Sequence, residues 1–153
     1  MMSLVTTIVA AWLLVLPVGA ADFEIPFKIY GKRHAILVQV AVNGKSCTFL
    51  LDTGAARTVV SPAVVGGLAG FNLKVSKFRA KGPGLAGEAI WETVNSLRLG
   101  KKTWYDQRVV VMNLKEVSRV YGRRIDGLLG QDILSEFSLV VIDFKNRKIV
   151  FTR

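Results

Sequence analysis

The stretch from residue 36 to residue 51 constrains the fold of this chain more than any other. Its first half alternates Ile36, Val38, Val40 and Val42 with Leu37, Gln39 and Ala41, and this period of two is typical of a β-strand. Asn43-Gly44 follows, and both residues tolerate the positive φ angles of a tight hairpin turn. Residues 47–51 (CTFLL) then supply a return strand, so the chain is expected to build on a β-hairpin.

Further β segments follow along the chain. Strand-like runs occur at residues 58–60, 74–80, 88–99, 109–112, 139–144 and 148–151. The stretch Gly82-Pro83-Gly84-Leu85-Ala86-Gly87 lies between the second and third of these runs and predicts a long hairpin with a readily bent tip. Residues 133–137 predict one short helix near the C-terminus, and the last two runs predict a terminal hairpin. The pattern therefore predicts one mainly-β domain over residues 22–153.

Composition excludes several kinds of chemistry. One cysteine, Cys47, cannot build an internal disulfide framework or a Cys-based zinc site, and we expect it to pack as a small core residue. One histidine, His34, is the single candidate base for Ser-His-Asp or Cys-His chemistry, and beside Arg33 we expect it to be a surface loop residue. We expect no metal and no cofactor.

The charge is strongly positive, with 21 Lys and Arg against 11 Asp and Glu and a formal net charge of +10. The basic residues are scattered, without a basic helix or an aromatic-basic repeat that could stack nucleic-acid bases. We interpret them as a solvated surface, with some preference for acidic substrates or for anionic envelope surfaces, and expect no nucleic-acid partner.

The first 21 residues are uncharged and differ from the rest of the chain. An apolar run from Ile8 to Leu16, then Pro17 and small residues up to Ala21, fits a secretory signal peptide and an exported protein. No Lys or Arg precedes the apolar run, which is unusual for a signal. If the segment stays uncleaved, residues 4–21 are just long enough to span a bilayer as a membrane anchor; both possibilities stay open.

The tripeptide Asp52-Thr53-Gly54 carries the most informative chemistry. It follows the apolar residues 49–51, where a carboxylate is costly unless it is hydrogen-bonded, paired or exposed at a turn. Gly54 and Ala55 permit such a turn and bring backbone N–H groups close to the carboxylate. A bare Asp-Thr-Gly arises by chance in about 1 in 40 chains of this length, so the tripeptide alone does not establish a function.

A second motif lies 74 residues downstream, where residues 126–134 read DGLLGQDIL. Two apolar residues and a glycine lead into a short helix with an acidic first turn. With LLDTGAARTVV at residues 50–60 and the glycine-rich hairpin between them, the chain resembles the retropepsin-like aspartic proteases, the retroviral proteases and their bacterial single-lobe relatives. The resemblance extends from about Gln39 to Phe151. It implies an all-β, single-lobe, barrel-like domain with one short C-terminal helix, acting as a homodimer.

The resemblance implies specific roles in the active-site loop. Asp52 would be the catalytic aspartate, Thr53 would join the two loops of a dimer by hydrogen bonds, and Gly54 and Ala55 would support the turn. Ala56 stands where the family commonly has Ser, a departure that leaves Asp52-Thr53-Gly54 intact.

The resemblance also assigns the neighbouring segments. Leu128, Leu129 and Gly130 would form the apolar-apolar-Gly corner beside the catalytic loop. Residues 81–88 would form a flap that closes over a peptide, with its tip at Gly82, Pro83, Gly84, Leu85, Ala86 and Gly87. Asp132 stands where retroviral members often carry Arg and bacterial-type members often carry Asp.

Amide hydrolysis by carboxylates needs two carboxyl groups, one ionised to activate water and one protonated to donate toward the carbonyl oxygen. This chain has one Asp-Thr-Gly, so the second aspartate is expected from a copy of the chain, Asp52 against Asp52 across a two-fold axis. Asp126 and Asp132 are alternative partners, but they fit better as a turn residue and a helix-start residue. The sequence thus predicts a homodimeric aspartic endopeptidase that uses water as nucleophile.

Two other functions stay open. A catalytically silent peptide- or protein-binding module could keep the same fold, and a nucleic-acid-binding β-barrel could use the basic surface. Trp91, close to the flap, is expected to be a packing residue or a substrate contact.

Overall fold

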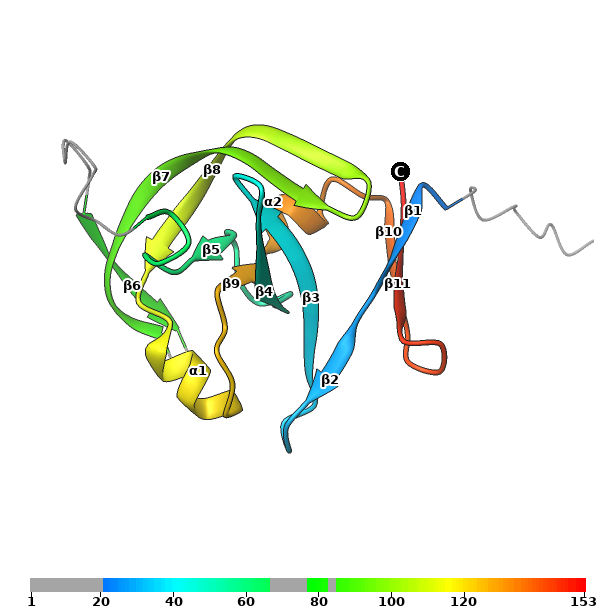
Figure 1. The fold of residues 1–153 in the computed structure, drawn as a ribbon, viewed down its shortest axis with the longest axis horizontal. Coiled ribbons are helices and arrows are strands. Elements are labelled where there is room, and N and C mark those ends of the chain that lie inside the picture. Colours follow the sequence, from blue (N-terminus) through cyan, green and yellow to red (C-terminus); the bar gives the residue numbers. More distant parts are fainter. Residues whose placement is uncertain (1–20, 67–76, 83–84) are drawn as a thin grey trace, which may run out of the picture.

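The computed structural model describes the backbone of residues 21–66, 77–82 and 85–153, and the side chains of residues 21–66 and 89–153. The predicted signal or anchor falls almost wholly on residues 1–20 and so lies outside the described residues. Strands dominate the rest, in one sheet of eight strands and one of three (Figure 1). The strands are β1 (Phe23–Pro26), β2 (Lys28–Tyr30), β3 (Ala35–Val42), β4 (Lys45–Leu51), β5 (Val59–Val60), β6 (Lys77–Gly82), β7 (Leu85–Leu99), β8 (Lys102–Met112), β9 (Gly127–Leu129), β10 (Leu139–Asp143) and β11 (Lys148–Thr152). The helices are α1 (Lys115–Tyr121) and α2 (Gln131–Leu134).

The large sheet closes on itself. Its order is β2-β3-β4-β9-β5-β8-β7-β6, and an additional pairing of β3 with β7 joins the two sides into a barrel. The barrel interior holds the larger apolar cluster, which includes Val38, Val40, Phe49, Val111 and Leu129. The all-β, barrel-like fold that the resemblance implies is therefore confirmed.

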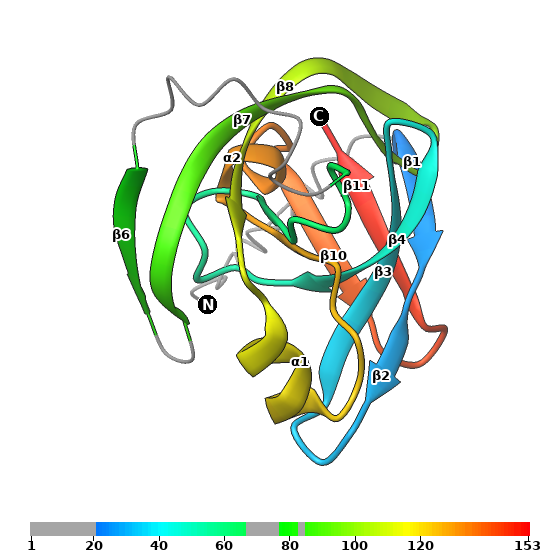
Figure 2. The same cartoon turned by 60° about the vertical axis from the view of Figure 1, so that its left-hand side comes forward.

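A second apolar cluster covers the other face of the same strands. Successive residues of a strand point to opposite faces, so Leu50, Leu128 and Val110 lie on the side away from the barrel interior. Leu114 and Val117, at the start of and within α1, complete this cluster. Figure 2 shows α1 at the opposite end of the barrel from α2. The sequence predicted a short helix at residues 133–137, and α2 begins two residues earlier, at Gln131. Helix α1 was not predicted.

The predicted hairpins are present. Strands β3 and β4 pair across Asn43-Gly44, and both turn residues have positive φ. Strands β10 and β11 form the terminal hairpin. The paired part of the middle hairpin is longer than predicted, because β6 and β7 pair up to Gly82 and Leu85. Pro83 and Gly84 lie outside the described residues.

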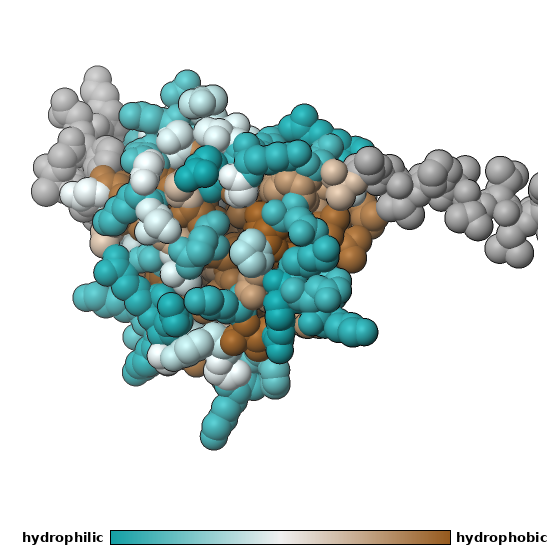
Figure 3. All heavy atoms as spheres, turned by 45° about the vertical axis from the view of Figure 1, so that its right-hand side comes forward, coloured by the Kyte–Doolittle hydropathy of each residue, from teal (hydrophilic) through white to brown (hydrophobic). Residues whose placement is uncertain are grey.

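The smaller sheet runs β1-β11-β10 and leaves β10 at one edge. Leu139 and Val141 of β10 are 40% and 42% exposed, while Val140 and Ile142 pack against the main core. Figure 3 shows apolar surface among hydrophilic side chains on this side of the molecule. In the part of the chain that is described, neither helix is long and apolar enough to cross a membrane.

Candidate active site

Asp52 begins a tight loop directly after β4. Its N–H donates to the carbonyl oxygen of Leu129 (3.1 Å), which continues the pairing of β4 with β9. Its Oδ1 accepts the N–H of Gly54 (2.9 Å), and its carbonyl oxygen accepts the N–H of Ala55 (3.2 Å). A Cβ at Gly54 would lie only 3.3 Å from this Oδ1. The loop thus holds one half-buried carboxylate at the end of an apolar strand.

The apolar corner predicted beside this loop is β9. Leu128 faces the second apolar cluster and Leu129 faces the barrel interior, both at most 1% exposed. Gly130 ends the strand, and a Cβ there would lie 2.5 Å from the carbonyl carbon of Arg57. Only glycine lets β9 approach the end of the Asp52 loop this closely.

Thr58 and Asp132 tie the far end of the loop to α2. The Thr58 hydroxyl donates to Asp132 Oδ1 (2.7 Å), and the Thr58 N–H donates to the same oxygen (2.9 Å). The hydroxyl oxygen in turn accepts the N–H of Gly130 (3.2 Å). Asp132 lies in the first turn of α2, which agrees with its interpretation as a helix-start residue. Its bond to Thr58 was not predicted, since nothing local in the sequence joins residues so far apart.

Gln131 is a second supporting residue that the sequence did not single out. Its side-chain Nε2 donates to the carbonyl oxygen of Thr53 (2.8 Å), and its backbone N–H donates to the carbonyl oxygen of Ala55 (2.8 Å). The Thr53 side chain itself is exposed and makes no hydrogen bond with the described residues. Gln131 of α2 therefore holds the backbone of the loop, and the Thr53 hydroxyl lies at the surface.

Asp126 is bound elsewhere. Its Oδ2 accepts the N–H of Thr48 (3.0 Å) and its Oδ1 pairs with Arg124 Nε (2.7 Å). Like Asp132, it has a structural partner of its own and does not lie beside Asp52 as a second catalytic carboxylate.

The predicted flap is the β6–β7 hairpin. The backbones of Gly82 and Leu85 pair, as do those of Ala86 and Gly87 with β6, while Pro83 and Gly84 lie outside the described residues. Its role as a flap stays a prediction.

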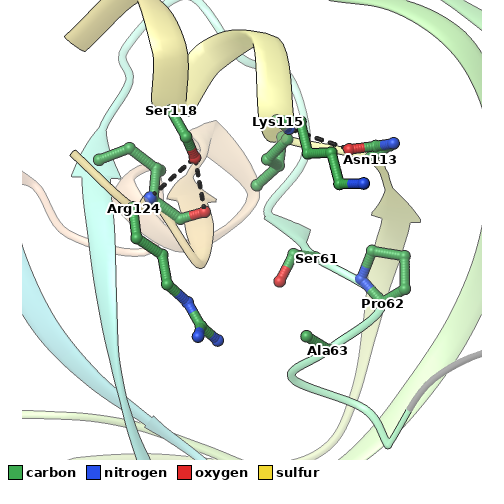
Figure 4. Close-up of a pocket in the computed structure, with 9 residues that line it drawn as sticks. Ser61, Pro62, Ala63, Asn113, Lys115, Ser118 and Arg124 are labelled. Atoms are coloured by element: carbon green, nitrogen blue, oxygen red, sulfur yellow. Dashed lines mark hydrogen bonds between the residues drawn. The ribbon is translucent and has the colours of Figure 1, made fainter. Parts of the chain in front are cut away.

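A pocket of about 530 Å³ lies beside α1. Figure 4 shows α1, with Lys115 and Ser118, on one side of it and the segment from Ser61 to Ala63 on the other. The Ser61 N–H donates to the carbonyl oxygen of Asp126, at the opposite end of β9 from Asp52, so this pocket is separate from the Asp52 loop. Among the described residues, no group of three His, Cys, Asp or Glu could hold a metal ion.

A closed β-barrel with Asp-Thr-Gly after an inner strand and a short helix after an apolar-apolar-Gly strand has the architecture of the retropepsin-like proteases. A family model described as aspartyl protease matches residues 38–133. The chain belongs to the aspartyl protease family. The resemblance identified from the motifs is thereby confirmed.

One solved structure supports the same fold, and a second matches at a lower TM-score. A crystal structure of a retropepsin-like aspartic protease from Rickettsia conorii matches with a TM-score of 0.55 and 22% identity, over 84% of this chain and 86% of that one. The EIAV protease in complex with the inhibitor HBY-793 matches with a TM-score of 0.44 and 20% identity, over 70% of this chain and 91% of that one. No curated protein sequence matches the chain.

Proposed function

We propose that this protein is an aspartic endopeptidase that works as a homodimer, with Asp52 of each chain forming the catalytic pair. The observation that carries the proposal is the Asp52 carboxylate, held by the Gly54 N–H (2.9 Å) at the end of an inner barrel strand in a chain of the aspartyl protease family. One carboxylate of the pair activates water and the other, protonated, donates to the carbonyl oxygen of the substrate.

The need for a second chain follows from where the other nearby carboxylates are bound. Asp126 is held by Thr48 and Arg124, and Asp132 is held by Thr58. In the proposed dimer a second Asp52 supplies the other carboxyl group, and a two-fold axis would bring it into place.

The edge of the smaller sheet supports this assembly. A strand with unpaired N–H and C=O groups invites pairing with another strand, and β10 offers such an edge with exposed apolar side chains at Leu139 and Val141. Antiparallel pairing of β10 with its copy would extend the three-stranded sheet of each chain across a two-fold axis.

The substrate would bind as an extended peptide beneath the β6–β7 hairpin, making strand-like hydrogen bonds. The N-terminal segment would direct the protein out of the cytoplasm, either as a cleaved signal or as an anchor that keeps it at the membrane.

The test is cleavage of a mixed peptide library by the full-length protein in mild detergent, across pH, beside Asp52→Asn. We expect a bell-shaped pH profile, because one carboxyl must be ionised and the other protonated, and no cuts from Asp52→Asn. After equal amounts of the two proteins are mixed and their subunits exchange, about a quarter of the activity of the same total amount of wild-type protein should remain, since only dimers with two Asp52 residues are active.

Two other results would support different interpretations. Half of the activity remaining in the mixture would mean that one chain suffices for catalysis. If the folded, dimeric wild-type protein cuts nothing at any pH, the catalytically silent binding module becomes the better interpretation, and Asp52→Asn should then bind peptides as well as the wild type does.

A further inference from the structure

Two arginines lie side by side next to the Asp52 loop. Val59 of β5 pairs with Val110 of β8 in parallel register, and the Val110 N–H donates to the carbonyl oxygen of Thr58 (3.0 Å). Arg108 precedes Val110 by two residues on β8 and so lies on the same face of that strand, and Arg57 lies in the bend two residues before Val59. Both side chains are exposed.

Both guanidinium groups stack on one aromatic ring. Arg108 Cζ lies 4.3 Å and Arg57 Cζ 5.8 Å from the centroid of the Trp91 ring. Trp91 pairs with Val110 and packs against the second apolar cluster. A ring that contacts both cations limits their freedom, so that they are oriented in advance for a ligand.

No carboxylate neutralises this pair within the described residues. The ion pairs found there use other basic residues: Lys102, Arg119, Arg124, Lys148 and Arg153. Glu92, next to Trp91 in sequence, lies on the opposite face of β7, and its Oε1 accepts the N–H of Thr93. Like charges at neighbouring strand positions destabilise a sheet, so an anionic ligand would stabilise both arginines.

The pair lies on the same face and at the same end of the sheet as Asp52. Leu50, Leu128 and Val59 are successive cross-strand neighbours in the second apolar cluster. Asp52 follows Leu50 by two residues and Arg57 precedes Val59 by two. Only β9 separates β4 from β5. Asp52 directly follows β4 and Arg57 lies just before β5, so we expect their backbones to be roughly 10 Å apart, two strand spacings.

We infer that Arg57 and Arg108, stacked on Trp91, form a subsite that binds a carboxylate side chain of the substrate. This inference rests on the proposed protease function, whose active site it extends. An extended peptide advances about 3.3 Å per residue, so the acidic residue lies about three positions from the cleaved bond. In a two-fold dimer the same subsite occurs on each side of that bond.

The test compares peptides that carry Glu or Gln at each position from two to four residues on either side of the cleaved bond. We expect kcat/KM to be about tenfold higher for Glu at one of these positions, mainly through KM, as for other charge-assisted hydrogen bonds. Arg57→Gln and Arg108→Gln should each reduce this preference, and Arg57→Glu should shift it toward Lys. Arg98→Gln is the matched control, because Arg98 is an exposed arginine at the other end of β7.

Binding separates this inference from the proposed function. Fluorescence anisotropy of labelled peptides on the full-length Asp52→Asn protein needs no cleavage. Tighter binding of the Glu peptide, lost in Asp52→Asn/Arg57→Gln and kept in Asp52→Asn/Arg98→Gln, would support the subsite even if the wild type cuts nothing. Equal binding of the Glu and Gln peptides, a preference that survives loss of both arginines, or no peptide binding at all would overturn it.

Discussion

Thr58 is the residue that joins the catalytic loop to the helix behind it. Its side chain is fully buried, and its hydroxyl both donates to Asp132 and accepts from Gly130. Asp132 Oδ2 is buried without a hydrogen-bond partner among the described residues, so Oδ1 carries the polar contacts of this carboxylate. One hydroxyl group therefore links the end of the loop to both Asp132 of α2 and Gly130.

Thr58→Val keeps the shape of this side chain and removes its hydroxyl. We expect the free energy of unfolding to fall by about 1–3 kcal/mol, because the buried Asp132 carboxylate loses a donor, and any peptidase activity to fall with it. Urea denaturation measures the first effect. Thr58→Ser, which keeps the hydroxyl, should retain most of both properties, and a Val variant as stable as the wild type would show that the hydroxyl contributes little.

Cys47 is a buried residue whose thiol reactivity can be measured. It is 2% exposed, and burial, followed by the nearby negative charge of Asp126, raises the pKa of its thiol above the ordinary value. The thiolate is the reactive form, so we expect Ellman's reagent to label the native protein at pH 8 far more slowly than the urea-unfolded protein.

The same pKa shift predicts the sign of a pH effect. In the unfolded chain the thiol pKa returns to its ordinary value, so the stability linked to the protonated native thiol is fully present below that value and is lost as the pH rises through the folded pKa. Rapid labelling of the native protein at pH 8 would contradict the buried position of Cys47.

At the scale of single residues, the sequence predicted the interactions between residues that are close together in the chain. Asp52, Gly54 and Ala55 form a local turn, in which the backbone N–H groups of Gly54 and Ala55 donate to oxygens of Asp52. The bonds from Asp132 to Thr58 and from Gln131 to Thr53 join residues more than 70 positions apart. They depend on the parallel pairing of β4 with β9, which no local pattern specifies.

Helix α1 shows the corresponding limit for whole elements. It has seven residues, its N-cap residue Leu114 makes no side-chain cap, and Val117 is its only fully buried residue. Asn113 supplies one local signal, because its Oδ1 accepts the N–H of Lys115 (2.9 Å). Such a short helix is stabilised by packing on the sheet and not by propensity, and that packing cannot be predicted from the helix segment alone.

Two valines of α1 provide a matched test of this packing. Val117 is 7% exposed and Val120 is 45% exposed. We expect Val117→Ala to lower the free energy of unfolding by about 1–2 kcal/mol, and Val120→Ala to change it by less than about 0.5 kcal/mol. Equal effects of the two substitutions in chemical denaturation would mean that α1 does not pack on the second apolar cluster as the structure has it.

The hairpins were predictable because their signals are short-range. Alternation along β3, the Asn43-Gly44 turn and the return strand lie within seventeen consecutive residues. The closure of the barrel was not readable in this way, since it depends on β3 pairing with both β4 and the distant end of β7. Family resemblance supplied that part of the fold.

At the scale of the whole molecule, β10 is the edge through which we expect two chains to join. Its outward side chains, Leu139 and Val141, are apolar and exposed, and an edge of this kind usually carries charges that prevent pairing. Val141→Lys places such a charge on the edge. We expect this variant to remain folded, to sediment as a monomer, and to lose peptidase activity, because each chain has one Asp52 to contribute.

Val120→Lys is the matched control for this substitution. It adds the same charge at a valine of similar exposure, on α1 and away from the small sheet. If the edge is the interface, Val120→Lys sediments and cleaves like the wild type, while the activity of Val141→Lys returns only at high protein concentration. A Val141→Lys protein that stays dimeric and active would place the two-fold axis on another surface, and the second aspartate would then have to reach the active site from there.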